Sequence, residues 1–177
     1  MAQGVREGGE VTEGEIQDAV YLWTSQHTLV LPNCYLFGEN ESDLVSVTKS
    51  GYVWEYEIKV SRRDFLADKR KSRHQWYSGS SFGDCSGWYR RPGTPEPRKP
   101  NRFFYVVEEG VANAEDLPEY AGLLVARRNE DGEVYVRREK MAPVLNKERA
   151  STELLLRIGS GFSFRYWRFR LQAGEKS

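Results

Sequence analysis

Two features are scarce in this chain of 177 residues: cysteine and long apolar runs. Cys34 and Cys85 are its only cysteines, which are too few for a disulfide scaffold or a zinc site and are consistent with a reducing cytosol. We expect one of the two cysteines to be a buried thiol and the other to lie in a loop. No apolar run approaches the roughly 20 residues of a membrane span, and the first 11 residues lack the apolar core of a signal peptide. We therefore expect a cytoplasmic protein with no membrane partner and a disordered tail over 1–11.

The chain also lacks net charge, because 26 basic and 26 acidic residues cancel. Composition alone predicts no polyanionic partner, so any nucleic-acid contact must come from local clustering. Hydrophobic residues make up 39% of the chain, enough for a core, and the length suits one compact domain, expected over 12–177. An irregular insertion rich in Gly, Ser, Pro and Arg is expected over 78–101. Its Trp88 and Tyr89 either pack onto the surface or touch a ligand.

Helix-capping patterns mark two helices in the first half of the chain. Thr12 and Glu15 have the spacing of a capping box, and the apolar residues that follow predict a helix over 13–25. Ser61 and Asp64 repeat the pattern and predict a helix from residue 62 to about 77. A last helix is expected to open at 151–153 with Leu154, Leu155 and Ile158 inward, and the following tail permits either a strand or more helix.

The segments between these helices have the sequence patterns of β-strands. The clearest signal is a hairpin over 42–48 and 52–60, in which Gly51 supplies the positive φ of a three-residue loop. The other expected strands are a first strand over 27–37 with a kink at Pro32, a buried strand over 102–107, and two strands over 122–127 and 133–137 joined by a turn at 129–132. The order of elements predicts an α/β fold.

The hairpin brings charged residues together. Glu57 and Lys59 share a face of the second strand, because side chains alternate along a strand. With a three-residue loop the paired positions put Asp43 opposite Glu57, about 4.5–5.5 Å apart. Two carboxylates this close repel each other, and a divalent cation such as Mg²⁺ is a natural compensation. Lys59 lies one pleat further along the same face. Its amine could hold an attacking water or neutralise negative charge on a phosphoryl transition state.

Each of these residues also has a plainer interpretation. A Glu and a Lys on one strand face are often a solvated ion pair, and Glu41 is available to Lys59 across the hairpin. A two-residue loop would shift the register and put Ile58 opposite Asp43. Glu15 is either an additional acid for a metal or simply part of its capping box.

The segment after the hairpin is strongly basic. Lys and Arg near a metal site suit phosphate contacts along a nucleic-acid backbone, whereas the alternative is a solvated helical face. His74 and Gln75 are weaker candidates for such contacts, and the closing stretch 164–170 mixes Arg with aromatics as single-strand binding surfaces do. The residues predicted to bind nucleic acid are Arg62, Arg63, Lys69, Arg70 and Arg73, with Lys71 in the same cluster.

Asp43 followed by Glu57-Ile58-Lys59, with a helix before and after, resembles the PD-(D/E)XK nuclease superfamily, although Ser42-Asp43 replaces Pro-Asp. The closer similarity is to MmcB-like DNA-repair and phage-type proteins of that fold, through the block EIKVSRRDFLADKR, the strand RFFYVV and the segment LPEYAGLL. The resemblance covers residues 12–157.

The resemblance implies a restriction-endonuclease-like αβββαβ core with a mixed sheet flanked by helices. It also implies a Mg²⁺-dependent DNA endonuclease, with Mn²⁺ as a substitute, acting in DNA repair or phage DNA processing. Asp43, Glu57 and Lys59 would be catalytic, and Asp43, Glu57 and the Ile58 carbonyl would hold the metal. The alternatives are a non-catalytic nucleic-acid-binding module of the same fold and a protein whose charged hairpin only forms ion pairs. The oligomeric state is open, with a homodimer as one option.

Overall fold

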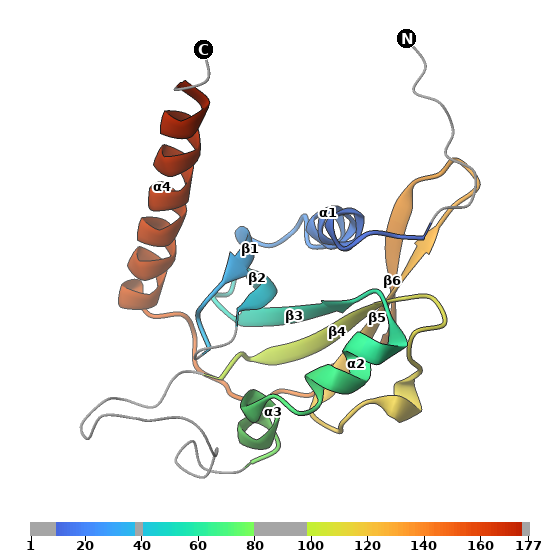
Figure 1. Cartoon of the computed structure of the whole chain (residues 1–177). Helices are drawn as coiled ribbons and strands as arrows, with labels where there is room; N and C mark the ends of the chain where they lie inside the picture. The colour runs from blue at the N-terminus through green and yellow to red at the C-terminus, as the bar shows by residue number, and fades with distance from the viewer. Residues whose placement is uncertain (1–9, 38–40, 80–98, 175–177) are drawn as a thin grey trace.

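The computed structural model describes residues 10–37, 41–79 and 99–174 and contains one six-stranded mixed sheet flanked by helices (Figure 1). Residues 1–9 of the expected tail and 80–98 of the expected insertion lie outside the described residues, as do Cys85, Trp88 and Tyr89. The elements, in chain order, are α1 (Glu13–Trp23), β1 (Leu29–Cys34), β2 (Ser42–Val47), β3 (Val53–Lys59), α2 (Arg62–Asp68), α3 (Ser72–Tyr77), β4 (Arg102–Glu108), η2 (Ala114–Asp116), β5 (Ala121–Arg128), β6 (Val134–Lys140) and α4 (Thr152–Gly174).

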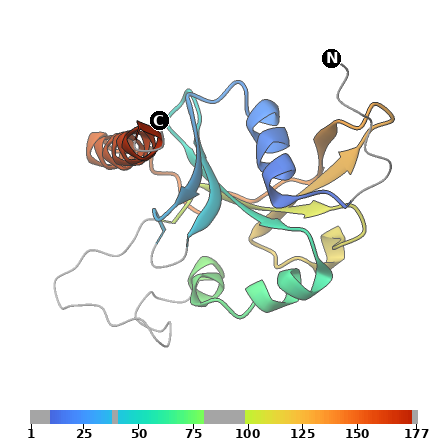
Figure 2. The same ribbon diagram turned by 45° about the horizontal axis from the view of Figure 1, so that its top comes forward.

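The strands lie in the sheet in the order in which they occur in the chain. β1, β2 and β3 are antiparallel neighbours, β3, β4 and β5 run parallel, and β6 returns antiparallel to β5. The parallel step from β3 to β4 requires a crossover, and α2 and α3 lie within it. α1 covers one face of the sheet and α2 and α3 cover the other (Figures 1 and 2).

Alternation along the central strands supplies a core on each face. On the α1 side, Ile16 packs in one buried cluster with Tyr56 and Phe104. On the α2 side, Phe65 packs in a second cluster with Phe103 and Tyr105. The adjacent residues Phe103 and Phe104 therefore face opposite sides of the sheet, which is why the run 102–107 is almost entirely apolar.

The expected helix over 62–77 is instead two helices. α2 ends at Asp68, and the amide of Lys71 donates to the Asp68 carbonyl at 2.9 Å in a turn that precedes α3. Residues five apart in one continuous helix differ by about 140° in direction. The break allows Asp68 and Arg73 both to point into the protein, where each is only 2% exposed.

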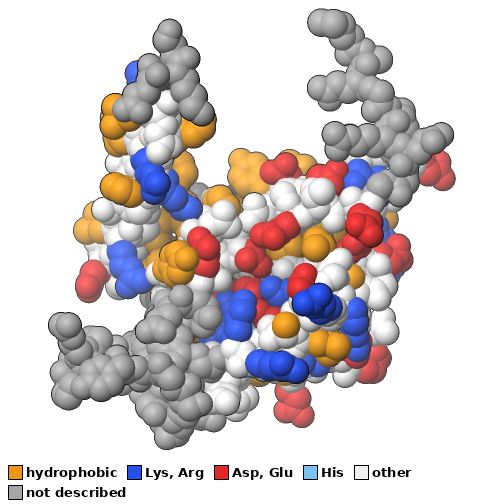
Figure 3. Space-filling view, in the orientation of Figure 1, with side chains coloured by type: hydrophobic (Ala, Val, Ile, Leu, Met, Phe, Trp, Pro, Cys, Tyr) orange, Lys and Arg blue, Asp and Glu red, His pale blue; other side chains and the backbone are white. Residues whose placement is uncertain are grey.

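The ambiguous tail is helical and forms α4, with the Ser151 hydroxyl accepting from the Leu154 amide at 3.1 Å. Ile158 is buried against the cluster near β1, whereas Leu155, expected inward, is 38% exposed. α4 stands away from the sheet in Figure 1, and Figure 3 shows apolar side chains along its surface. None of the helices in the described ranges is both long enough and apolar enough to cross a bilayer.

Arginines join α4 to the outer edge of the sheet. Arg165 donates to the backbone carbonyls of Pro32 and Asn33 at 2.6 and 3.0 Å, and Arg157 donates to the Tyr35 carbonyl at 2.8 Å. These carbonyls lie in and just after the edge strand β1. The arginines of α4 thus satisfy acceptors that an edge strand otherwise leaves to solvent or to another chain.

Glycine at position 122 is required by close packing between β4 and β5. A Cβ there would lie 2.5 Å from the Phe104 ring and 2.6 Å from the Ala142 backbone nitrogen, which is closer than real Cβ atoms approach other atoms. Gly122→Ala should therefore lower the free energy of unfolding by about 2 kcal/mol or more, through overpacking. Chemical denaturation measures this change.

The matched control is Gly14→Ala, because Gly14 lies in α1 and a Cβ there meets no atom within 4 Å. That substitution should raise stability by about 0.5–1 kcal/mol, the usual gain of replacing Gly by Ala in a helix. Equal effects of the two substitutions would contradict the packing described for β4 and β5.

Candidate active site

The β2–β3 hairpin has the register that the three-residue loop predicts. Leu44 pairs with Tyr56, Val45 with Glu55, and Val47 with Val53. Gly51 adopts a φ of 80°, and its amide donates to the Thr48 carbonyl at 2.9 Å, which closes the turn. The alternative two-residue loop is therefore wrong, and extension of this register points Asp43 toward Glu57.

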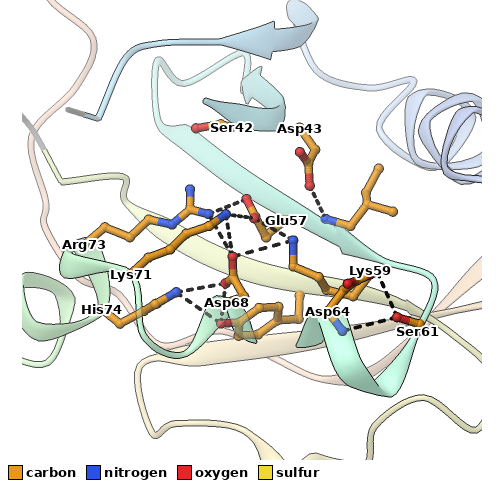
Figure 4. Close-up of polar contacts among 12 residues, drawn as sticks. Ser42, Asp43, Glu57, Lys59, Ser61, Asp64, Asp68, Lys71, Arg73 and His74 are labelled. Carbon is orange, nitrogen blue, oxygen red and sulfur yellow. Dashed lines mark hydrogen bonds and ion pairs between the residues drawn. The ribbon is translucent and has the colours of Figure 1, made fainter. Parts of the chain in front are cut away.

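The backbone ladder between β2 and β3 ends at the pair of Leu44 and Tyr56, so Asp43 lies just beyond it. The Asp43 Oδ2 atom accepts a hydrogen bond from the Ile58 amide at 2.6 Å, so the carboxylate takes the place of a backbone acceptor (Figure 4). The Ser42 hydroxyl donates to Glu55 Oε1 at 2.6 Å. Asp43 thus lies at the edge of β3, because the Ile58 amide needs an acceptor where β2 diverges.

Glu57 is buried, with 1% exposure, and three cations surround its carboxylate (Figure 4). Lys59 Nζ and Lys71 Nζ each lie 2.7 Å from Oε1, and an Arg73 guanidinium nitrogen lies 2.6 Å from Oε2. The contact with Arg73 lacks hydrogen-bond geometry, so Oε2 has no hydrogen-bond donor among the described residues. Lys59 therefore pairs with Glu57, while Glu41, its proposed cross-strand partner, accepts from the Tyr35 hydroxyl.

Asp68 forms the second negative centre of the same cluster. Its Oδ1 atom lies 2.6 Å from Lys71 Nζ and 3.5 Å from Lys59 Nζ, so both ammonium groups bridge Glu57 and Asp68. Its Oδ2 atom lies 2.8 Å from His74 Nε2 and accepts from the Tyr105 hydroxyl at 2.9 Å. His74 Nδ1 bonds in turn to the Tyr120 hydroxyl at 2.6 Å. β3, α2 and α3 are joined through these contacts.

Glu55 completes the cluster beneath the surface. It is fully buried and accepts from the Tyr77 hydroxyl at 2.6 Å and from Arg73 at 3.1 Å. Burial raises the pKa of Glu55, and the Arg73 charge opposes that rise. Burial would lower the pKa of Arg73, but the charges of Glu55, Glu57 and Asp68 raise it above its usual value. Arg73 is therefore a fixed internal cation.

The carboxylates also determine the protonation of Lys59. Burial alone would lower the pKa of Lys59, but Glu57 and Asp68 raise it above its usual value. Burial likewise disfavours the charged form of Asp68, yet its bond to His74 and the neighbouring cations Arg73 and Lys59 hold its pKa well below the usual range. Lys59 is thus an ammonium ion at neutral pH, suited to orient a water or neutralise developing negative charge rather than to accept a proton.

Asp43 behaves differently from the paired acids. Burial and the negative charge of Glu57 raise the pKa of Asp43 to about 7, while the Ile58 amide and Lys59 oppose the rise. Glu13 on α1 also raises it. Asp43 and Glu57 are therefore electrostatically coupled, and Asp43 is the acid at this edge that is least compensated by cations.

Glu15 occupies its predicted capping box. Its carboxylate accepts from the Thr12 amide at 2.9 Å and from Arg128 at 3.0 Å. The Thr12 hydrogen bonds and Arg128 lower the pKa of Glu15 to about 2. The structure does not bring Glu15 into contact with the cluster around Glu57, and Glu13 is the α1 acid whose charge reaches Asp43.

The residues predicted to bind nucleic acid fall into three groups. Arg73 and the weaker candidate His74 are buried, with 2% and 6% exposure, and so do not belong to a phosphate-binding surface. Arg62 binds Asp116 through two hydrogen bonds of 2.7 Å, and Lys69 donates to the Asp116 carbonyl at 2.6 Å. Arg63 on α2, Arg70 in the turn between the helices and Gln75 on α3 are exposed. Figure 3 shows Lys and Arg side chains gathered over the region of α2 and α3.

The donors near Asp43 have the chemistry that Mg²⁺ prefers. Asp43 and Glu57 offer carboxylate oxygens, and the Ile58 carbonyl lies on the same side of the strand as its amide, toward Asp43. The raised pKa of Asp43 fits a missing positive partner. Over 10–37, 41–79 and 99–174, however, no group of three or more His, Cys, Asp or Glu side chains is arranged to hold a metal ion. The residues thus supply two carboxylates and a carbonyl, with water or phosphate needed for the rest.

Glu55, Asp68 and Lys71 are charged cluster members that the sequence did not single out as site residues. The signal for Asp68 is its position three residues after Phe65, which puts both on the inward face of α2. Lys71 carries no comparable signal, because its direction depends on the break between the two helices.

Comparisons with known proteins support the fold only. No family model matches the chain, and no curated protein matches it. A solved structure of a protein of unknown function from Silicibacter pomeroyi is similar, with a TM-score of 0.59 and 20% sequence identity. The match covers 92% of this chain and 94% of that chain. The fold is therefore shared with a second protein at low sequence identity.

The raised pKa of Asp43 predicts how stability depends on pH. A carboxyl whose pKa rises from 3.8 to about 7 on folding binds more protons in the folded state between these values, so stability falls as pH increases through that window. Asp43→Asn keeps an acceptor for the Ile58 amide but removes the charge. It should raise the free energy of unfolding by about 1–3 kcal/mol at pH 8 and change it little at pH 4.

Denaturant unfolding of both proteins at the two pH values, without divalent cations, measures this difference. A pH-independent effect of Asp43→Asn would contradict the coupling between Asp43 and Glu57. Asp131→Asn, at the exposed β5–β6 turn, is a control with the same change of charge.

Proposed function

We propose that this chain is a Mg²⁺-dependent DNA endonuclease with a restriction-endonuclease-like core, in which Mn²⁺ can replace Mg²⁺. The observation that carries the proposal is the edge of the β2–β3 hairpin, where Asp43 bonds to the Ile58 amide and is coupled to Glu57, while Lys59 extends from the same strand. A role in DNA repair or phage DNA processing is consistent with the sequence resemblance.

The roles follow from the chemistry of each group. Asp43, Glu57 and the Ile58 carbonyl would hold the metal, which when bound supplies a Lewis acid for the phosphodiester group. Lys59 is held as a cation by Glu57 and Asp68 and would orient the attacking water or offset charge on the phosphoryl oxygens. Arg63 and Arg70, exposed on the neighbouring helical surface, would contact backbone phosphates.

Removal of Lys59 provides the direct test. Lys59→Ala leaves Glu57 with Lys71 and Arg73, so the protein should still fold. Cleavage should drop about 100-fold or more, because the ammonium that stabilises the transition state is lost. The assay follows supercoiled, linear and single-stranded DNA with Mg²⁺, and far-UV circular dichroism checks the fold.

Lys49→Ala is the matched control, since it removes the same charge from an ammonium at the hairpin turn that bonds to Gln26 instead. Undiminished cleavage by a folded Lys59→Ala protein would refute the assignment. Cleavage that is insensitive to chelation of divalent cations would refute the metal requirement.

A non-catalytic nucleic-acid-binding module is the second candidate. It is favoured by the three cations that already neutralise Glu57, because a protein that only binds DNA needs no vacant metal position. It shares with the first candidate the exposed basic surface at Arg63 and Arg70. The two candidates differ in cleavage and agree on binding.

Both candidates predict that Arg63→Ala and Arg70→Ala weaken DNA binding. Each substitution should raise the Kd by about three- to tenfold and reduce the slope of log K against log salt by about 1, as loss of one phosphate contact does. Arg138→Ala, an exposed arginine on β6, should leave that slope unchanged. Fluorescence anisotropy over a salt series measures the three variants, and equal slopes in all of them would rule out this surface.

A further inference from the structure

The buried cluster is electrically balanced before any metal is added. Its carboxylates are Glu55, Glu57 and Asp68, and its cations are Lys59, Lys71 and Arg73, so the formal charges cancel. His74 adds a neighbouring polar group, bonded to Asp68 through Nε2 and to the Tyr120 hydroxyl through Nδ1. A divalent cation at Glu57 would bring two excess positive charges, of which ionised Asp43 offsets one.

The remaining charge requires one resident cation to withdraw from Glu57. Arg73 is held on all sides, because it also pairs with Glu55 and its side chain is only 1% exposed. Lys59 is 11% exposed and extends from the rigid strand β3. Lys71 differs from both, since its side chain is 36% exposed and it lies at the N-cap of α3, in the short connection from α2.

The contacts of Lys71 allow it to move without leaving the cluster uncompensated. Its ammonium lies 2.7 Å from Glu57 Oε1 and 2.6 Å from Asp68 Oδ1. If it turns away from Glu57, Asp68 still has His74 and Tyr105 as hydrogen-bond partners and Arg73 as an ion-pair partner. Glu57 keeps Lys59 and Arg73.

We infer that Lys71 is a built-in counter-ion that competes with a divalent cation for the Glu57 carboxylate. The inference rests on the proposed function, because it assigns Glu57 to a metal. Lys71 keeps the carboxylates compensated without metal and lowers the affinity for the ion. Metal binding moves its ammonium from Glu57 toward solvent, to which its side chain is already 36% exposed.

The test is binding of Mn²⁺ alone, followed by electron paramagnetic resonance and by calorimetry. Lys71→Met should bind Mn²⁺ about tenfold or more tightly than the unaltered protein, because the ion no longer has to displace an ammonium from Glu57, and that attraction is stronger beside a buried carboxylate than in water. Lys71→Gln keeps a polar group and serves as a second variant if Lys71→Met folds poorly; it should also bind more tightly.

Lys69→Met is the matched control, because it removes an equal charge two residues from Lys71 in the sequence. The Lys69 ammonium contacts the Asp116 carbonyl and the Phe65 ring instead of Glu57. Its Mn²⁺ affinity should equal that of the unaltered protein. Unchanged or weaker Mn²⁺ binding by both Lys71 variants would overturn the inference about Lys71, but it would not contradict the proposed nuclease function. Tighter binding by these variants without any DNA cleavage would support the inference and reject the nuclease. If neither the unaltered protein nor any of the variants bound Mn²⁺, both the inference about Lys71 and the metal-dependent nuclease would be overturned.

Discussion

The pairing of Glu57 with Asp68 through shared lysines is the interaction on which this part of the structure depends. Two carboxylates in a sheet–helix interface lose their hydration, and that loss is tolerable only when cations and hydrogen bonds replace the water. Lys59 and Lys71 each contact both carboxylates, so they fix the distance between β3 and the end of α2. The break between α2 and α3 follows from the same need, since it brings Arg73 to the interior.

Asp43 is not one of these cation-paired acids, and its protonation and binding chemistry therefore differ from theirs. The paired acids are neutralised by contacts within the protein, whereas Asp43 has only a backbone amide and a more distant lysine to offset its burial. A carboxyl in that condition either takes up a proton or recruits a cation. The neighbouring strands β2 and β3 therefore carry both the acids that are best compensated by internal cations and the acid that is least compensated.

Much of the fold and part of the site could be predicted from the sequence. Capping residues, strand alternation and Gly51 are local signals, and they led to the correct helix starts, the hairpin and its register. Whether a charged side chain is buried or exposed cannot be predicted from its neighbours in the sequence. Arg63 and Arg73 look alike in the chain, yet one is exposed and the other is among the most buried side chains, because only the packing of α3 against β3 distinguishes them.

The sequence by itself determined the register of the β2–β3 hairpin, because a three-residue loop and a period of two leave little choice of pairing. It also determined that Glu57 and Lys59 share a face. Only the tertiary structure decided which cations neutralise Glu57 and that Asp68 joins it, since these contacts cross from a strand to two separate helices. Hydrophobic periodicity specifies elements, but the partners of buried charges are fixed by how those elements pack.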